Sequence, residues 1–333
     1  MNKKIITFQT EVQVNQIQTI LEKNYLTIIT EYFELQRGWL YRAYMAFSDI
    51  DKYFILISLV NKTFNAYKDY LVKMNYDDFY SQKQFEIKKF NVVDISRELA
   101  ISKETARRKI LELENMGIIR KEKKNLFIQR GTYELQKPIE SIIAISRFMS
   151  SLSKKLKESN IIQNEVSSKE FETLIKENYT LCWNIFLEHQ LSFMTEVKVK
   201  FFHDLETWVV WGNILYNQNL HLNQKIKGMK NYEEFISNTS TNLTDELTAL
   251  TGTIGLNAMT ISDLTGIPRP TVIRKLNKLQ KDQYITKDKN GRYTMINSTN
   301  TKAINEFRIK NISRISSMIG RIFNSARLIE YRI

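Results

Sequence analysis

The segment from Asp94 to Asn125, DISRELAISKETARRKILELENMGIIRKEKKN, constrains the fold more than any other stretch of the chain. Ser102 can cap the free N–H groups of a new helix, so one helix should stop before it and another should start after it. Apolar residues at i, i+4 and i+7 then share one face of the second helix: Ala106, Ile110 and Leu113. Gly117 is typical of a helix C-terminus. Two short extended runs follow, Ile118–Ile119 and Leu126–Ile128. The segment predicts a helix-turn-helix followed by a hairpin.

The same pattern returns 166 residues later without a gap across its core, at Ile267 in place of Ile101. The other matched pairs are Thr105 and Thr271, Arg108 and Arg274, Lys109 and Lys275, and Leu113 and Leu279. The apolar stripe recurs as Val272, Leu276 and Leu279, and the strands recur as Tyr284–Thr286 and Tyr293–Met295. Two copies in register indicate an internal duplication.

The duplication extends into the flanking helices. Thr19, Asn24, Tyr25 and Gln36 match Thr173, Asn178, Tyr179 and Gln190. We expect helices over 11–36, 39–47 and 50–72, and a closing helix in each half with apolar residues at 3-4-3 spacing. Those apolar residues are Ile142, Ile145, Met149 and Leu152 in one helix, and Ile312, Ile315, Ile319 and Ile322 in the other. The polar stretch 154–168 should join the halves, which predicts domains at 1–160 and 161–333. Two copies favour a fused pseudo-dimer over a repeat array.

Composition limits the classes of partner. The 333 residues carry a formal net charge of +13, which favours a polyanion, either nucleic acid or an anionic membrane surface. A solvated basic surface is the alternative explanation of this charge. The longest apolar run, 53–60, is too short to cross a bilayer, so no membrane partner is expected. One cysteine excludes a disulfide framework and a thiolate metal cluster, and it fits a reducing cytoplasm.

Each half resembles a MarR-type winged-helix regulator, with long leading helices, a helix-turn-helix, a basic wing and a closing helix. The turn Thr265–Val272, TGIPRPTV, is also similar to that of IclR-type regulators. The specific part of the match covers roughly 90–130 and 256–296, within winged helices at about 90–131 and 254–298. The resemblance implies a mainly α fold, with two tandem winged helix-turn-helix units on a helical scaffold and a pseudo-twofold axis. It also implies interlocked leading and closing helices, and recognition helices 102–115 and 268–281 in the major groove.

Carried over by position, the expected DNA-binding residues fall into three groups. The first recognition helix supplies Lys103, Thr105, Arg107, Arg108 and Lys109. The second supplies Arg269, Thr271, Arg274, Lys275 and Lys278. The wings supply Lys121, Lys123, Lys124, Lys287, Lys289 and Arg292. Arg108 and Arg274 are best placed for a base edge, since arginine can bond guanine through two donors, whereas the wing cations suit phosphate. A solvated surface charge is the competing interpretation of each cation alone.

The two recognition helices differ in sequence. Lys103 corresponds to Arg269, Glu104 to Pro270, and Arg107 to Ile273. We therefore expect two unlike half-sites, on the order of 34 Å apart if both helices read one face of the duplex. The expected function is a sequence-specific double-stranded DNA-binding transcriptional regulator in the cytoplasm, associated with the nucleoid, as a monomeric pseudo-dimer or a homodimer. The alternatives are a plasmid- or phage-type replication initiator with tandem winged helices, and an architectural winged-helix protein that mediates protein contacts.

Enzymatic chemistry is not expected. The glycines form no phosphate-binding loop, and His189, His203 and His221 have no ligand-like spacing, so we expect no cofactor and no metal. Cys182 is expected to be a buried apolar thiol. The resemblance also allows a small aromatic or acidic effector, but the aromatic residues at helical spacing favour ordinary core, and no effector residue is assigned.

Overall fold

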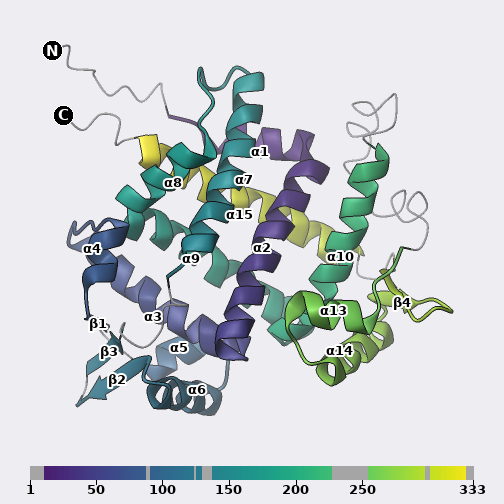
Figure 1. Cartoon of the computed structure of the whole chain (residues 1–333), viewed down its shortest axis with the longest axis horizontal. Helices are drawn as coiled ribbons and strands as arrows, with labels where there is room; N and C mark the ends of the chain where they lie inside the picture. The colour runs from purple at the N-terminus through teal and green to yellow at the C-terminus, as the bar shows by residue number, and fades with distance from the viewer. Residues whose placement is uncertain are drawn as a thin grey trace. The chain divides into compact units, whose positions relative to one another are not determined.

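The computed structural model describes residues 11–87, 91–123, 125–129, 137–226, 254–296 and 301–327. These residues are mainly helical, with one three-stranded and one two-stranded antiparallel sheet (Figure 1). Within these ranges, none of the helices has the length and the apolar character needed to pass through a bilayer. The mainly α class expected from the sequence is confirmed.

The chain divides into two compact units. Unit 1 comprises residues 1–17, 51–201 and 314–333, and unit 2 comprises residues 18–50 and 202–313. These units do not coincide with the sequence halves 1–160 and 161–333. Segment 18–50 of the first half belongs to unit 2, and segment 161–201 of the second half belongs to unit 1. Each unit is therefore assembled from residues of both halves.

Unit 1 holds the first helix-turn-helix segment. Its elements are α3 (Ile50–Asp69), α4 (Tyr76–Ser81), β1 (Gln84–Ile87), α5 (Val92–Glu98), α6 (Lys103–Asn115), β2 (Ile119–Glu122), β3 (Asn125–Gln129), α7 (Ile139–Glu158), α8 (Ser168–Glu177) and α9 (Tyr179–Val197). Helices α7 and α8 pack together, and α9 packs against α4 and α8. Rings from three helices meet in the core, where Phe79 lies 5.1 Å from Phe64 and 5.3 Å from Tyr179 between ring centroids. The stripe expected in the closing helix α7 is buried, because Ile142, Ile145, Met149 and Leu152 are at most 1% exposed.

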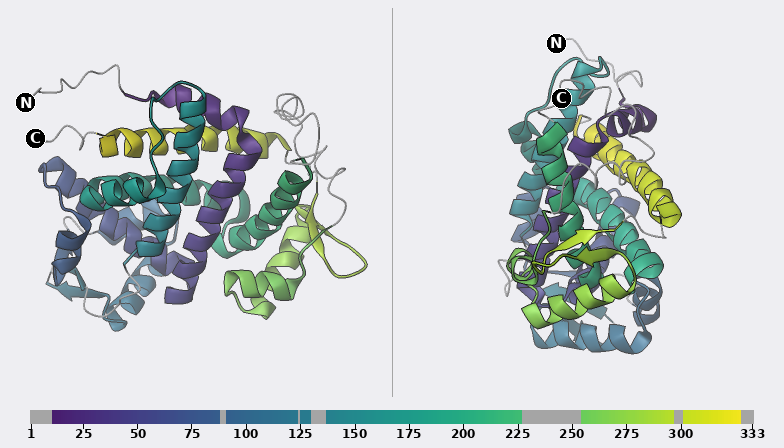
Figure 2. Two further views of the ribbon diagram at one scale, coloured as in Figure 1. Left: turned by 45° about the horizontal axis from the view of Figure 1, so that its top comes forward. Right: turned by 90° about the vertical axis from the view of Figure 1, so that its right-hand side faces the viewer.

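Unit 2 holds the second helix-turn-helix segment. Its elements are α2 (Tyr25–Phe47), α10 (Leu205–Ile226), α13 (Ala258–Thr265), α14 (Arg269–Lys281), β4 (Ile285–Lys287) and β5 (Tyr293–Met295). Helix α10 contacts α2 on one side and α13, α14 and β5 on others, and Figure 2 shows α13, α14 and the hairpin gathered beside α10. The Asn223 amide fixes the α2 contact by donating to Leu26 O at 3.0 Å and to Thr30 Oγ1 at 2.6 Å.

Three further helical elements each contain residues of both units. Helix α1 covers Val14–Lys23, the π-helical turn η3 covers Lys198–Phe202, and α15 covers Thr301–Arg327. The stripe expected in α15 is buried, because Ile312, Ile315, Ile319 and Ile322 are at most 8% exposed.

The leading helices differ from the expected ones in their boundaries. The single helix expected over 11–36 is interrupted at Asn24, where α1 gives way to α2. The separate helix expected over 39–47 is wrong, because α2 continues through Gly38 to Phe47. A glycine within a helix costs only about 1 kcal/mol relative to alanine, and the buried face of α2 on either side, which includes Tyr32 and Trp39, outweighs that cost.

Candidate nucleic-acid interface

A set of side-chain caps fixes the angle between α5 and α6 in unit 1. Asn91 begins α5 by accepting the Val93 N–H at 2.9 Å, and Ser102 begins α6 by accepting the Thr105 N–H at 3.0 Å. Between the helices, Ser96 Oγ donates to Ile101 O at 2.6 Å. These bonds satisfy backbone groups that a helix end leaves free, so the turn is held from both sides. The helix stop and restart expected at Ile101–Ser102 is confirmed.

The turn between α13 and α14 in unit 2 has the same serine bond 166 residues later, and Asn257, the counterpart of Asn91, caps α13 through the third residue after it instead of the second. Asn257 accepts the Thr260 N–H at 2.9 Å, and Ser262 Oγ donates to Ile267 O at 2.7 Å. Gly266, in the place of Ala100, also has a positive φ, 72° against 49°. The second turn lacks a counterpart of the Ser102 cap, because Pro268 occupies that position without a side-chain bond.

Gly266 lies against the Met45 side chain of α2, at a position whose positive φ favours glycine. A Cβ added there would lie 2.8 Å from the Met45 sulfur, in addition to the strain of the positive φ. The helix-turn-helix of unit 2 therefore packs against α2, a helix from the opposite sequence half.

Helices α6 and α14 each bury their apolar stripe. Ala106 and Leu113 are 0% exposed and Ile110 is 8% exposed, while Val272, Leu276 and Leu279 are all 0% exposed. The opposite faces carry exposed cations, which are Lys103, Arg107 and Arg108 on α6 and Arg269 and Arg274 on α14. Thr105 and Thr271 are half-buried at the start of each helix. Each unit thus presents a basic helix face to solvent.

Lys275 does not belong to the basic face of α14. Its side chain is 11% exposed, and its Nζ lies 2.7 Å from Asp204 Oδ1 and 3.3 Å from Glu206 Oε2 at the start of α10. Lys278 turns the same way and donates to Phe202 O at 2.8 Å. The groove contact expected of these two lysines stays a prediction; in the structure both ammonium groups bind partners within unit 2, and the Lys278 side chain is 41% exposed.

Lys109 is the counterpart of Lys275 in unit 1 and is also partly withdrawn from the surface. Its side chain is 13% exposed, and its Nζ lies 3.7 Å from Glu112 Oε2, which Lys52 Nζ approaches to 3.4 Å. Arg108 stays 64% exposed, with its Nε 3.8 Å from Glu112 Oε1. Lys109 is therefore a packing contact of α6, whereas Arg108 remains accessible.

Ion pairing at the start of α10 is reflected in the charge state of Asp204. Burial by itself would raise the pKa of this carboxyl, but hydrogen bonds from Lys275 and Thr207 hold the pKa below its ordinary value. Asp204 also caps α10, because its Oδ1 accepts the Thr207 N–H at 2.7 Å. One carboxylate thus starts α10 and anchors α14.

The two hairpins place further cations at the surface. Lys121 and Lys123 are exposed in unit 1, and Lys287, Lys289 and Arg292 are exposed in unit 2. Lys124 lies outside the described residues. In the second hairpin, Asp288 Oδ1 accepts the N–H groups of Asn290 at 2.9 Å and Arg292 at 2.8 Å, which orders the tip.

The structure adds features that the sequence expectations missed. Strand β1 pairs antiparallel with β3, with Phe85 opposite Ile128, so the first hairpin is part of a three-stranded sheet in which β3 is the central strand. Arg120 on β2 is exposed, and its guanidinium pairs with Glu122 and donates to Gln84 Oε1 at 3.0 Å. Alternating apolar residues in QFEI were the available signal for β1.

Glu98, the last residue of α5, attaches the helix-turn-helix α5–α6 to the rest of unit 1. Its carboxylate lies 3.0 Å from Lys62 Nζ and accepts a 3.0 Å hydrogen bond from Ser58 Oγ, both on α3. Its backbone carbonyl accepts a 3.2 Å hydrogen bond from Thr195 Oγ1 on α9. These bonds attach the C-terminal end of α5 to two long helices, so the module is held at a defined position in the unit.

Of the other residues considered for chemistry, Cys182 and His189 are buried in unit 1, whereas His203 and His221 belong to unit 2. Burial raises the pKa of the Cys182 thiol to about 12, and the side chain is 1% exposed, as expected for an apolar thiol. Burial, with Arg314 nearby, lowers the pKa of His189 to about 3. His203 is exposed in the turn before α10, and His221 is half-buried within that helix. Within the described ranges, no three His, Cys, Asp or Glu side chains are grouped so as to hold a metal ion.

Comparison with known proteins leaves the interface to be judged on this geometry alone. No protein-family model, curated protein or solved structure matches the chain.

Proposed function

We propose that the chain is a sequence-specific DNA-binding regulator in which two winged helices, α5–α6 with β1–β3 and α13–α14 with β4–β5, read two different half-sites. The observation that carries this proposal is the paired framework of the two turns. In each unit an asparagine caps the first helix and a serine bonds a carbonyl of the turn, and the second helix exposes its cationic face to solvent. A short helix with one buried and one basic face suits the major groove.

The cations divide by position into two roles. Arg108 and Arg274 lie mid-helix on the exposed faces, where a guanidinium can bond a guanine edge through two donors. Lys103 and Arg269 lie at the first residue of each helix, and the hairpin cations lie at the flanks, which suits the phosphates on either side of a groove. Lys109, Lys275 and Lys278 take no part, because their ammonium groups serve internal pairs.

Binding-site selection from a random duplex pool tests the proposal, followed by affinity measurements on the winner at several salt concentrations. Arg108→Ala and Arg274→Ala should each weaken binding to the selected site by about 10- to 100-fold, the value of a bidentate arginine–guanine contact. Lys123→Ala should weaken binding to all sequences alike and lower the salt slope by roughly one unit.

A matched control removes charge elsewhere. Lys154 is exposed on α7, which belongs to neither winged helix, and Lys154→Ala changes the net charge by the same amount as the arginine variants. It should leave the affinity within about twofold. Equal losses for Lys154→Ala and Arg108→Ala would mean that the chain senses only total charge. Absence of binding to any duplex would refute the proposal.

A further inference from the structure

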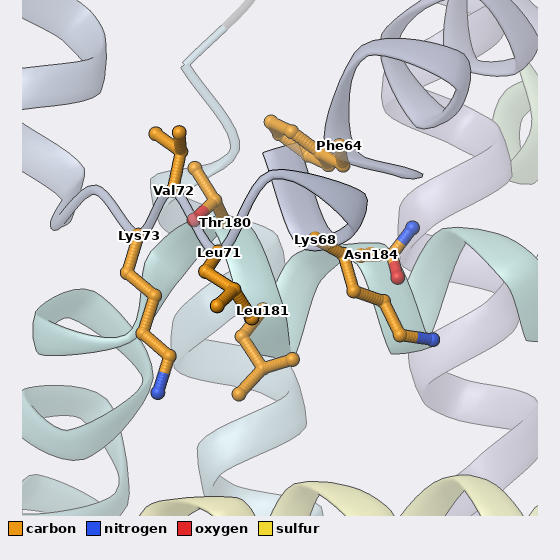
Figure 3. Close-up of a pocket in the computed structure, with 8 residues that line it drawn as sticks. All are labelled: Phe64, Lys68, Leu71, Val72, Lys73, Thr180, Leu181 and Asn184. Carbon is orange, nitrogen blue, oxygen red and sulfur yellow. The ribbon is translucent and has the colours of Figure 1, made fainter. Parts of the chain in front are cut away.

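A pocket in unit 1 opens between the C-terminal end of α3, the loop after it and the first turns of α9 (Figure 3). Its volume is about 100 Å³, and its wall is almost entirely apolar. The lining side chains are Phe64, Lys68, Leu71, Val72, Lys73, Thr180, Leu181 and Asn184. The pocket lies on residues that the DNA-binding proposal does not use.

The walls are held by hydrogen bonds, so the pocket is preformed. Thr180 Oγ1 accepts the Met74 N–H at 3.1 Å, which ties the loop to α9. The Asn184 amide donates to Asn61 Oδ1 at 2.8 Å and to Asn65 Oδ1 at 2.9 Å, which ties α9 to α3. A pocket with fixed walls does not need ordering when a ligand enters, so it can retain affinity for a small molecule.

Leu71 lies in the turn that ends α3, beside the pocket. Its φ is 56°, in the left-handed region that favours glycine. This conformation lets the Val72 N–H donate to Tyr67 O at 2.7 Å in the turn that ends the helix. Its side chain nevertheless stays 88% exposed, with its inner part on the pocket. The exposure of this large apolar side chain at the edge of an apolar pocket places it where it can cover a ligand.

The charge at the pocket mouth is positive. In Figure 3 the side chains of Lys68 and Lys73 flank Leu71 and Leu181, and both lysines are exposed. Within the described residues, neither ammonium group forms an ion pair. An apolar interior with cations at its rim recognises a molecule that has an alkyl end and an anionic end.

We propose that this pocket binds a short-chain aliphatic carboxylate, with the alkyl group between Phe64 and Leu181 and the carboxylate between Lys68 and Lys73. Volume sets the length of the alkyl group. An apolar cavity of about 150 Å³ accepts benzene, so a pocket two thirds of that size takes a branched group of about four carbon atoms. Isovalerate matches this description, and its size sets the expected dissociation constant on the order of 1 mM.

Calorimetric titration of the full chain with isovalerate tests the site, with 3-methyl-1-butanol as the uncharged probe. Replacing both lysines, Lys68→Met with Lys73→Met, should weaken isovalerate by about tenfold and leave the alcohol unchanged, because methionine keeps the apolar stem. Leu181→Trp should abolish binding of both probes by filling the half-exposed edge of the pocket.

Leu71→Gly separates ligand binding from stability. Glycine relieves the positive φ, so the melting temperature should rise by about 2–4 °C while isovalerate binding weakens by about tenfold. Gln283→Gly is the matched control, because Gln283 has a φ of 59° at the end of α14, outside the pocket. It should raise the melting temperature and leave binding unchanged. No binding at about 20 mM isovalerate, equal affinity for the alcohol, or binding that survives Leu181→Trp would overturn the proposal.

Discussion

Arg274 and Lys275 are adjacent on α14, yet the structure predicts opposite consequences of replacing them. Lys275→Met leaves Asp204 and Glu206 without their shared cation. Breaking a buried pair costs about 3–5 kcal/mol and an exposed pair about 0–1 kcal/mol. Because the lysine is 11% exposed and the carboxylates are 33% and 28% exposed, we expect a loss of about 2 kcal/mol, or about 4–8 °C in the melting temperature of unit 2.

Tryptophan fluorescence measures this loss, since Trp39, Trp208 and Trp211 are all buried in unit 2. Asp204→Asn keeps an N-cap for α10 but removes the charge, so it should lower the cost of Lys275→Met in a double-mutant cycle. At a temperature where both proteins are folded, Lys275→Met should keep DNA affinity within about twofold, whereas Arg274→Ala should lose affinity and keep stability. A tenfold loss of affinity in Lys275→Met with an unchanged melting temperature would refute the assignment.

The pH dependence of stability provides an independent check of the pair between Asp204 and Lys275. The pKa of Asp204 in the folded protein lies below its unfolded value of about 3.8. The carboxylate therefore contributes its full stabilisation above about pH 3.8, and this stabilisation is lost as the pH falls through the folded pKa. The stability difference between wild type and Lys275→Met should therefore persist from neutral pH to about pH 4 and shrink below it. A difference that disappears between pH 7 and pH 5 would contradict this assignment.

Three other outcomes follow from unit 1. Ser102→Ala removes the cap of α6 and should cost about 1 kcal/mol of unfolding free energy by urea denaturation, with Ser102→Asn retaining most of it. His189 has a folded pKa of about 3 against 6.5, so the unfolded chain binds the extra proton first and stability should fall by about 2 kcal/mol from pH 7 to pH 5. His189→Leu introduces an apolar residue that does not titrate, so it should flatten that slope. Cys182 should resist a disulfide reagent at pH 8 in the native protein and react within minutes after unfolding in urea, and rapid native labelling would contradict its burial.

Helical spacing predicts which cations of α6 and α14 point inward. Lys275 stands three residues after Val272 and four before Leu279, so it shares their face and points inward. Lys109 has the same relation to Ala106 and Leu113. What spacing could not supply was the partner, because Asp204 lies 71 residues away in the chain and forms the pair only once α10 packs on α14.

Local signals in the sequence identified the two turns well, because caps and glycines act within a few residues. Asn91, Ser102 and Gly117 each fix a helix end by contacts inside their own segment. The assembly of the units is different. A repeat shows which residues correspond, but not which copy they pack against, and the contact between Asn223 and Thr30 joins residues from opposite halves. Tertiary packing decides that choice.

Repeating the binding-site selection with Arg108→Ala and with Arg274→Ala tests most directly whether the chain has two unlike reading heads. The wild type should enrich an imperfect, bipartite site. Arg108→Ala should lose base preference in one half-site only, and Arg274→Ala should lose it in the other half-site only. A perfect palindrome in the wild type, or variants that relax both half-sites equally, would contradict the account.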